Sequence, residues 1–499
     1  MSLAPELDAN IQMMMHALHM PEIGDCKRRE FKLGDAGACL FFMEGMAGQA
    51  QIDKLIMEPC RSYSGALPMD AQSRIAFITA QILTANDVVY NDLPDQIARQ
   101  VLEGKTALIV DGCPEALLIE TRNYEKRPVG KTITESVVMG AQQGFVESLR
   151  TNITLIRRIL KSAQLTTEMH TVGSSMPTSL AILYLHEACE ESALREVRRR
   201  ILCIDAAHVP DIGQLQQLIE DRRFMILPRT LLTERPDRAC HLISEGHIAI
   251  VMDNSPYALI APVSLFDFLC TADDNFMRSS YSTFNRLVRI SGLFISLMLP
   301  GFYVALTMFH TQMIPMELLI SIATARVKVP FPVIIELLIM EFSFYLINEA
   351  GTRMPSQIGS ALGIVGALIL GQAAVSANII SPLLIIIAAL TGLGNYAIPD
   401  YGLGIAVQIV RLAFLFAGAT MGLFGMAMAT FICAGLLSAM DSFGQPYLSP
   451  RSPWRPGGRA VVLQTPSWRL NRMPFGVSMK SWLKRTPHGS KMRGWEDDE

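Results

Sequence analysis

The sequence predicts an α/β cytoplasmic region of two tandem homologous subdomains, followed by an all-α polytopic membrane domain. Three observations support this fold class. Charged residues lie mostly in the first half and at the end of the chain, a sequence repeat runs through the first half, and long apolar stretches fill most of the second half. At 499 residues the chain is also too long for a single hydrophobic core.

The membrane domain is predicted from the distribution of charge. Hydrophobic residues make up 50% of the chain and charged residues 18%. The segment before residue 290 has the charge density of a soluble protein, whereas residues 290–440 hold only nine charged residues. These nine are Glu317, Arg326, Lys328, Glu336, Glu341, Glu349, Arg353, Asp400 and Arg411. We therefore expect a membrane domain over residues 285–440.

An internal repeat organises the first half of the chain. When the chain is aligned with itself, without gaps, so that Pro94 falls on Pro236, nine positions between 94 and 119 carry the same residue in both copies. They pair Pro94 with Pro236, Asp95 with Asp237, Glu103 with Glu245, Gly104 with Gly246, Ala107 with Ala249, Asp111 with Asp253, Pro114 with Pro256, Ala116 with Ala258 and Leu117 with Leu259. The same alignment superposes the apolar residues 40–43 on residues 182–185. Such self-similarity indicates one structural unit that occurs twice.

Each copy is predicted to end in a β-hairpin. In the first copy Thr106–Val110 and Ala116–Ile119 flank an Asp-Gly turn, and in the second Ile248–Met252 and residues 257–262 flank an Asp-Asn turn. The shared Pro-Asp pairs at 94–95 and 236–237 could contact a ligand. We favour the alternative that they start helices, with Pro in the first helical position.

The repeat and the charge pattern together define the expected domain organisation. We expect a flexible N-terminus over 1–30, a first α/β subdomain over 31–135 and a second over 177–265, with a basic C-terminal tail over 441–499. Residues 136–176 are expected to hold an amphipathic linker helix, because apolar residues recur at helical spacing between 145 and 160. That helix could be a solvated bridge, or it could transmit motion or dock on a neighbouring subunit; the sequence leaves both open.

No catalytic, cofactor or metal site is expected, so the chain is not predicted to be an enzyme. The two Gly-Lys-Thr triplets at 104–106 and 130–132 lack the second glycine that a phosphate-binding loop needs, since Arg99 and Glu125 hold that position. Nine cysteines occur without a CxxC pair, which argues against a zinc site and a disulfide framework. The start of the chain lacks the basic residues of a secretory signal, so the soluble region should stay in the cytoplasm.

The apolar half is predicted to cross the membrane an even number of times. Residues 290–309 are long enough to span a bilayer, and further apolar stretches follow near 333–347, 358–375, 379–398, 403–421 and 423–440. Arg278, Arg286 and Arg289 precede the first stretch and the basic tail follows the last, which places both ends in the cytoplasm. Because the stretch with Glu336 and Glu341 is short and charged, four and six crossings both remain open.

Charged residues inside the membrane domain are candidate functional groups, since they are costly there and usually face other helices or water. Glu336 and Glu341 lie five residues apart and need not share a helix face. One of them could face a polar pathway while the other pairs with a neighbour. Asp400 and Arg411 have opposite charges, and we expect them to form a structural ion pair. The glycine-rich stretch 358–375 could pack closely against other helices or line a narrow apolar gate.

Several sequence blocks resemble the A subunits of bacterial spore germinant receptors, the GerA family. They are GFVESLRTNITLIRR at 144–158, TERPDR at 233–238, LPGFYVALTMFHTQMIPMELL at 299–319, GIVGALILGQAAV at 363–375 and SFGQPYLSP at 442–450. The resemblance covers residues 31–450. It implies a multi-pass protein in the lipid of the spore inner membrane, with both termini on the cytoplasmic core side.

The resemblance also implies a function and partners. Such A subunits work with a transporter-like B subunit, which is thought to bind the nutrient, and with a lipoprotein C subunit. They are thought to form a homo-oligomeric cation channel that triggers germination, and no nucleic acid partner is implied. Carried onto this chain, the pore-lining candidates are Gly363, Ile364, Val365 and Leu368. A SpoVAF-like auxiliary germination ion channel is the second interpretation. A membrane transporter is a third, although the membrane half shows no inverted repeat.

Overall fold

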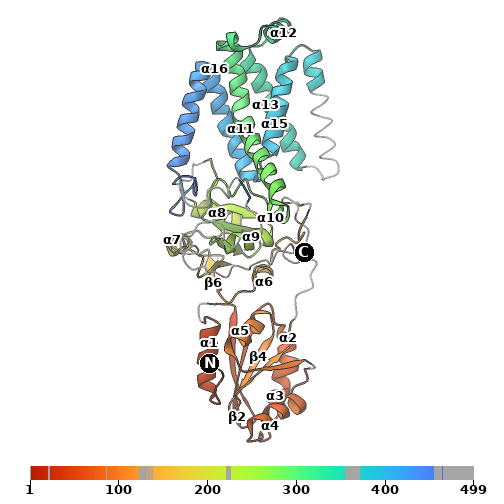
Figure 1. Ribbon diagram of the computed structural model, residues 1–499, viewed down its shortest axis with the longest axis vertical. Coiled ribbons are helices and arrows are strands. Elements are labelled where there is room, and N and C mark those ends of the chain that lie inside the picture. The colour runs from red at the N-terminus through yellow and green to blue at the C-terminus, as the bar shows by residue number, and fades with distance from the viewer. Residues whose placement is uncertain are drawn as a thin grey trace, which may run out of the picture.

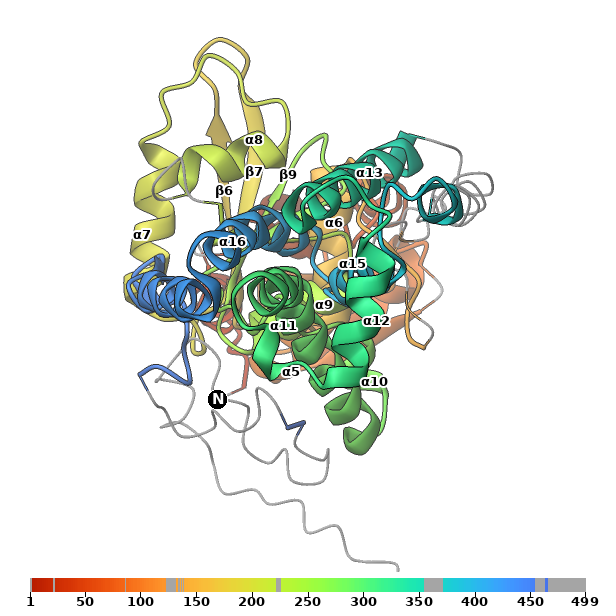
Figure 2. The same ribbon diagram turned by 90° about the horizontal axis from the view of Figure 1, so that it is seen from above.

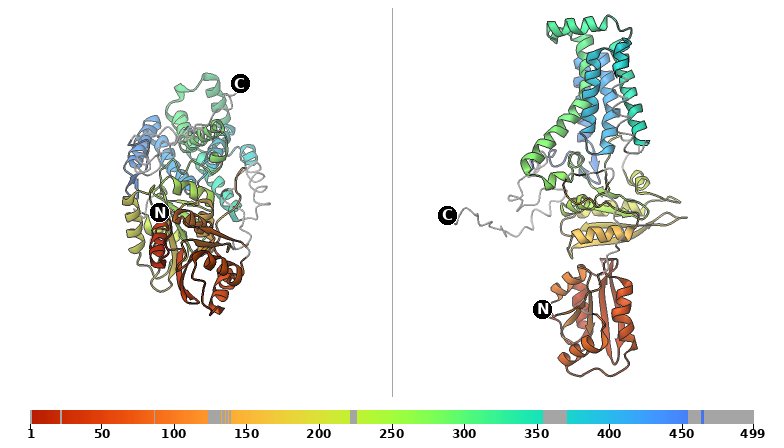
Figure 3. Two further views of the ribbon diagram at one scale, coloured as in Figure 1. Left: turned by 60° about the horizontal axis from the view of Figure 1, so that its bottom comes forward. Right: turned by 90° about the vertical axis from the view of Figure 1, so that its right-hand side faces the viewer.

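A computed structural model describes most of the chain and arranges it in three parts along one long axis. It describes residues 2–453, apart from 21–22, 86, most of 123–138, 221–225 and 354–370, and it also describes 463–464. An α/β subdomain lies at one end, a second α/β subdomain lies in the middle and a bundle of long helices lies at the other end (Figure 1, Figure 3). The order in space follows the order in the sequence.

The first subdomain is a five-stranded sheet with helices on both faces. Its sheet order is β1-β2-β4-β5-β3, with every neighbouring pair antiparallel. The strands are β1 (Cys26–Leu33), β2 (Ala36–Met43), β3 (Val88–Asn91), β4 (Thr106–Val110) and β5 (Ala116–Ile119). The helices are α1 (Leu7–Ala17), α2 (Gln49–Ile52), α3 (Glu58–Ser62), α4 (Ala71–Phe77) and α5 (Pro94–Leu102), with π-helical turns at Asp53–Met57 and Ile78–Ile82.

The second subdomain has the same strand order in its own sheet, β6-β7-β9-β10-β8. Its strands are β6 (Leu165–Val172), β7 (Thr178–Leu185), β8 (Leu231–Thr233), β9 (Ile248–Met252) and β10 (Ala258–Ala261). Its helices are α6 (Leu149–Ile159), α7 (Glu191–Leu202), α8 (Ile212–Ile219) and α9 (Pro236–Ser244). Alternate residues of each central strand enter two separate cores, one under α6 and α9 and one under α7 and α8.

The two sheets correspond element by element in the alignment that places Pro94 on Pro236. Matching elements begin at the same interval along the chain. This holds for five pairs: α1 and α6, β2 and β7, α5 and α9, β4 and β9, and β5 and β10. Both predicted hairpins are present, as β4–β5 and β9–β10. Pro94 and Pro236 each occupy the first turn of a helix, which confirms the expectation that the Pro-Asp pairs start helices.

A pair of buried asparagines repeats the same local structure in both subdomains. Asn10 donates to the Ala4 carbonyl at 2.6 Å and accepts from the Ala4 amide at 2.7 Å. Asn152, also fully buried, makes the same two bonds to Val146, at 2.6 Å and 2.8 Å. Each side chain therefore fixes the chain that leads into its helix.

The structure differs from the expected domain boundaries in two places. The predicted flexible N-terminus contains α1, whose Ile11 and Met14 are buried against the first sheet. The predicted linker helix is α6, which packs on the second sheet, so it belongs to that subdomain rather than between the two. The subdomains meet instead at a buried ion pair, in which Arg157 donates to Asp25 at 2.6 Å.

The second half of the chain is a bundle built around one long helix (Figure 1). Its helices are α10 (Asp273–Phe276), α11 (Ser279–Phe309), α12 (Met316–Arg326), α13 (Val333–Arg353), α15 (Pro382–Tyr396) and α16 (Tyr401–Ser438), with a 3-10 turn at Thr311–Met313. Of the described helices, α11 and α16 are long and apolar enough to cross a membrane, by length and composition. Viewed from above, α12 lies across the far end of the bundle (Figure 2).

Helix α16 is interrupted at Gly422 and folds back on itself. Gly422 has a φ of +61°, a conformation that glycine adopts readily. Both Phe414 and Met426 lie against Gly301 of α11, which a straight helix could not achieve. The segments 401–421 and 423–438 therefore run side by side, and His310 Nε2 accepts the freed amide of Leu423 at 3.3 Å.

The chain after α16 returns to the second subdomain. β11 (Asp441–Ser442) and β12 (Gln445–Pro446) form a short hairpin, and residues 441–447 are called the C-terminal hairpin below. Its Tyr447 is fully buried and its Ser442 is buried. Residues 441–453 thus differ from the expected basic tail, whereas most of 454–499 lies outside the described residues.

Replacing either buried asparagine should loosen its own subdomain only. Asn152→Ala leaves a buried amide and a carbonyl of Val146 without partners, and Asn10→Ala does the same at Ala4, at a cost of about 1–3 kcal/mol each. Hydrogen–deuterium exchange should show faster exchange around 145–153 for the first variant and around 3–12 for the second. Asn275→Ala, at an exposed position, is the matched control. If one substitution reduced the protection against exchange in both subdomains, the two subdomains would not be separate structural units.

Candidate functional site

A buried ion pair lies in the middle of the helix bundle. Arg411 Nη2 of α16 lies 2.7 Å from Glu341 Oε2 of α13 and donates to the Tyr345 hydroxyl at 2.8 Å. Arg411 Nη1 donates to Ser296 Oγ of α11 at 3.3 Å. Arg411 and Glu341 are each only 4% exposed. Three helices are therefore joined by one charge-neutral network, the arrangement that a low-dielectric surrounding favours.

The second intramembrane glutamate has different surroundings. Glu336, at the start of α13, is fully buried, and its Oε2 accepts the backbone amide of Ser381 at 3.0 Å. That amide lies at the N-terminus of α15, where the helix dipole favours negative charge. The other oxygen, Oε1, has no hydrogen-bond partner within the described part of the chain. The two glutamates thus face different neighbours, one a cation and the other a helix end.

The expected pair of Asp400 and Arg411 does not form. Asp400 instead caps α16, and its Oδ1 accepts the Leu403 amide at 2.7 Å. Eleven residues separate Asp400 from Arg411, which places Arg411 about three turns further into the bundle, beside Glu341. The candidates Gly363, Ile364, Val365 and Leu368 lie outside the described residues.

Two buried arginines join the second subdomain to the chain on either side of it. Arg238 of α9 donates to Glu135 Oε1 at 2.6 Å and to the carbonyl of Cys270 at 2.9 Å. Arg235 pairs with Asp237 at 2.7 Å and donates to the carbonyl of Ala141 at 2.8 Å. A guanidinium can serve several acceptors at once, so these residues hold the segments before and after the subdomain together.

A third cluster attaches the first membrane helix to the same region. Asp274, which is fully buried, lies 3.0 Å from Arg286 Nε and 2.8 Å from Arg289 Nη1, both on α11. Arg289 also donates to Thr271 Oγ1 at 2.9 Å. Two of the basic residues that precede the first apolar stretch, Arg286 and Arg289, therefore hold the start of α11 against Asp274. We call this cluster and the Arg238 contacts the membrane junction.

The C-terminal hairpin bonds the second subdomain to the chain that follows α16. Ser442 Oγ donates to the Arg229 carbonyl at 2.7 Å, and the Tyr447 hydroxyl donates to the Pro228 carbonyl at 2.8 Å. Gln445 Nε2 donates to Glu190 at 2.7 Å. The second subdomain is thus bonded both where the chain enters the bundle and where it leaves.

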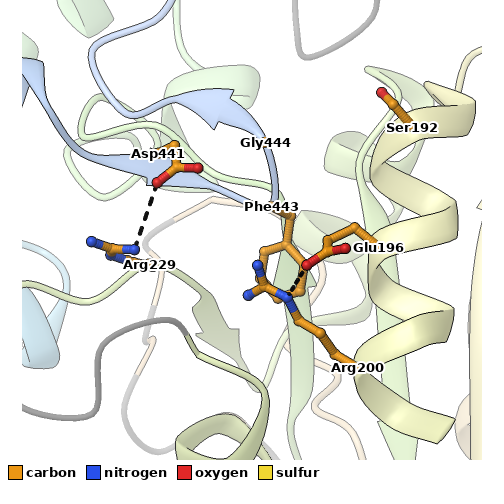
Figure 4. A pocket seen from close by; sticks show the side chains of 7 residues that line it. All are labelled: Ser192, Glu196, Arg200, Arg229, Asp441, Phe443 and Gly444. Carbon is orange, nitrogen blue, oxygen red and sulfur yellow. Dashed lines mark hydrogen bonds and ion pairs between the residues drawn. The ribbon is translucent and has the colours of Figure 1, made fainter. Parts of the chain in front are cut away.

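A pocket of about 460 Å³ lies between this hairpin and α7 (Figure 4). Arg200 lies over the Phe443 ring at 4.2 Å and pairs with Glu196 at 2.8 Å, and Arg229 lies 3.8 Å from Asp441. Because the acidic and basic side chains pair with one another, the lining is electrically balanced. Its residues are Ser192, Glu196, Arg200, Arg229, Asp441, Phe443 and Gly444.

Two titratable groups beside the membrane junction have raised pKa values. Burial raises the pKa of the Glu245 carboxyl to about 7, against the opposing charge of His247. His241, whose side chain is exposed, lies with its Nε2 3.4 Å from Glu245 Oε1. The pKa of the buried Cys270 thiol is raised to about 11, which keeps this sulfur protonated and a weak nucleophile.

Glu336 and Glu341 can be recognised in the sequence as unusual charges, but several residues that surround them or form the junction cannot be predicted in this way. Arg238 and Ser442 lie within the sequence blocks 233–238 and 442–450, which carried the family resemblance. Asp274 and Tyr345 lie outside the sequence blocks that carry the family resemblance, and no motif marks them. Their roles depend on contacts between elements that are distant in the sequence.

Removing one member of the ion pair in the bundle should destabilise it strongly. Arg411→Met leaves the Glu341 carboxylate buried without a cation, which costs about 3–5 kcal/mol. The double variant Glu341→Leu with Arg411→Met removes both charges and should recover most of the loss. Thermal unfolding of the detergent-extracted protein measures the effect. Equal stability of the two variants would argue against a paired charge at this place.

A family model described as Bacillus/Clostridium GerA spore germination protein matches residues 13–475. The N-terminal domain of the A subunit of the Bacillus megaterium spore germinant receptor GerK3 aligns with 52% of this chain and 96% of its own, at 25% identity and a TM-score of 0.38.

Curated relatives match over most of their length. Spore germination protein KA of Bacillus subtilis (strain 168) is 35% identical over 92% of this chain and 84% of its own. Spore germination protein B1 of the same organism is 31% identical over 94% and 97% of the two chains. Spore germination protein GerQA of Bacillus cereus is 36% identical over 81% of each. With a family model that spans most of its length and relatives of this extent, the chain belongs to the GerA family of spore germination proteins.

Proposed function

We propose that this chain is the A subunit of a spore germinant receptor, which oligomerises into a nutrient-gated cation channel in the spore inner membrane. The observation that carries the proposal is the membrane junction together with the C-terminal hairpin, because these contacts bond one soluble subdomain to the chain both before α11 and after α16. A subdomain attached in this way can pass a displacement to every helix of the bundle. Because the chain belongs to a family of spore germination proteins, the proposed channel would act in spore germination.

The two sheets are proposed to be tandem homologous subdomains of the cytoplasmic region. Their support is the constant interval between matching elements and the paired contacts of Asn10 and Asn152. Independent origins would not place the same hydrogen bonds at matching positions of the two copies. A fixed repeat beside the membrane gives the receptor two similar surfaces for its partners.

The membrane domain is proposed to be polytopic with six crossings. α11 begins beside the second subdomain, and the C-terminal hairpin after α16 packs on that same subdomain, so the chain enters and leaves on one side. An even number of crossings is therefore required. The described residues provide five segments along the bundle, namely α11, α13, α15 and the two halves of α16. The apolar stretch expected from the sequence at 358–375, most of which lies outside the described residues, is proposed as the sixth.

The same segment contains the pore-lining candidates Gly363, Ile364, Val365 and Leu368. In the proposed oligomer, one such segment from each copy would surround a common axis and form an apolar gate that opens when it becomes wet. Glu336 and Glu341 remain candidate polar residues beside the pathway. A transporter-like B subunit and a lipoprotein C subunit are the proposed partners, with the nutrient bound outside this chain. Both termini would lie on the core side of the spore inner membrane.

Smaller side chains at the proposed gate should make the channel leak. Val365→Ala and Leu368→Ala widen an apolar constriction, so conductance through planar bilayers should rise without a nutrient signal, and spores should germinate without nutrient. Ile386→Ala, at an exposed apolar position of α15, is the matched control. Unchanged conductance would remove this segment from the pore. A protein that is monomeric both in mild detergent and in native membranes would overturn the channel itself.

Breaking the membrane junction should uncouple the nutrient signal from the bundle. Arg238→Ala removes the bonds that join Glu135, α9 and the Cys270 carbonyl, so germination in response to nutrient should be slowed or lost. Arg195→Ala, an exposed arginine of α7, is the control. Release of dipicolinate measures the response, with immunoblots of inner membranes to confirm equal protein levels. A normal response from Arg238→Ala at normal abundance would exclude this route of coupling.

A further inference from the structure

Three oxygen atoms in the outer half of the bundle are buried without hydrogen-bond partners among the described residues. They are Glu336 Oε1 of α13, the Tyr303 hydroxyl of α11 and Ser381 Oγ at the start of α15. Their residues are 0%, 6% and 2% exposed, respectively. Buried polar atoms are nearly always paired, so three orphans at one place require an explanation.

The three residues belong to one site. Glu336 Oε2 accepts the Ser381 amide at 3.0 Å, which places the carboxylate directly at Ser381. The Tyr303 hydroxyl lies close enough to the Ser381 side chain to interact with it, and Tyr303 packs in the same core cluster as Leu337, Ile380 and Leu384. Three helices thus bring a carboxylate and two hydroxyls to a shared position in an otherwise apolar core.

The chemistry of these atoms favours a small monovalent cation. Glu336 forms no ion pair with a described residue, whereas Glu341, five residues away, has Arg411. An ionised carboxylate in an apolar core needs a compensating charge. Carboxylate and hydroxyl oxygens are hard ligands, which suit alkali-metal ions. One carboxylate supplies a single negative charge, and divalent ions such as Ca²⁺ are usually held by several.

We propose that Glu336, Tyr303 and Ser381 bind an alkali-metal cation between α11, α13 and α15. The ion neutralises Glu336 and joins the start of α13 to the start of α15, as Arg411 joins the helices deeper in the bundle. The site rests on the proposed function, since it gives a cation-conducting assembly a binding position within each subunit. It differs from the pore candidates, because it lies inside the helix bundle of a single chain.

Cation-dependent stability tests the site without any need for conduction. The full-length protein in mild detergent is melted in KCl, in NaCl and in N-methyl-D-glucamine chloride at equal ionic strength. At saturating K⁺ or Na⁺ the melting temperature should rise by about 2–4 °C above that in N-methyl-D-glucamine. Glu336→Gln keeps an acceptor for the Ser381 amide but removes the charge, so it should abolish the shift. Tyr303→Phe should reduce it.

Glu317→Gln is the matched control, because Glu317 is an exposed acidic residue of α12. It should keep the full shift. A wild-type protein that melts at the same temperature in all three salts would overturn the site, as would a full shift in Glu336→Gln. A cation-dependent shift in a protein that does not conduct would leave the site standing and overturn the channel. A protein that conducts but shows no cation-dependent shift in melting temperature would leave the channel standing and overturn the site.

Discussion

A charged guanidinium can remain inside an apolar helix bundle only if its charge is neutralised there, and this requirement organises the membrane half of the protein. Arg411 meets Glu341, and the pair draws in Tyr345 and Ser296, so that α11, α13 and α16 are fixed relative to one another. Glycines let the helices come close enough for these contacts. A Cβ on Gly301 would lie 2.6 Å from the Phe414 carbonyl oxygen, and one on Gly394 would lie 2.6 Å from the Gly292 carbonyl oxygen.

The soluble half is linked to this bundle by the same kind of interaction. Buried charge pairs occur at each connection: Asp25 with Arg157 between the subdomains, Glu135 with Arg238 before the second sheet, and Asp274 with Arg286 and Arg289 at the first membrane helix. Such charge-assisted hydrogen bonds need a defined geometry, unlike apolar packing. The three parts are therefore held in defined relative positions, and a shift of one part has a route to the next.

Much of the fold could be predicted from local patterns in the sequence. The repeated positions between 94 and 119 can be recognised in the sequence because several of them hold residues that a turn or a helix start requires. Gly104 and Gly246, for example, have φ values of +98° and +102°. α1 was missed although Leu7, Asn10 and Ile11 recur at 149, 152 and 153. β1 and β6 are shifted by three positions relative to the interval that the other matching elements share, so an ungapped alignment loses the signal between them.

The contacts of the candidate site could be predicted less well. The sequence identified Glu336 and Glu341 as unusual, but their partners depend on packing across the bundle. Arg411 pairs with Glu341, far earlier in the chain, rather than with Asp400, because a helix-start aspartate is better used to bind its own backbone. Glu135 and Arg238 are also distant in the sequence, and they meet where Glu135 accepts a hydrogen bond from Thr233 of β8, just before α9.

The two subdomains have the same strand order but make different contacts. The face of α9 that carries Arg235 and Arg238 is covered by the chain leading to the membrane, whereas the matching positions on α5, Leu93 and Gln96, are open to solvent. The second subdomain is thus bonded to the helix bundle through this face, whereas the same face of the first subdomain is not. The residues of each copy are consequently free to diverge under separate pressures, and substitutions at equivalent positions should not be read as interchangeable.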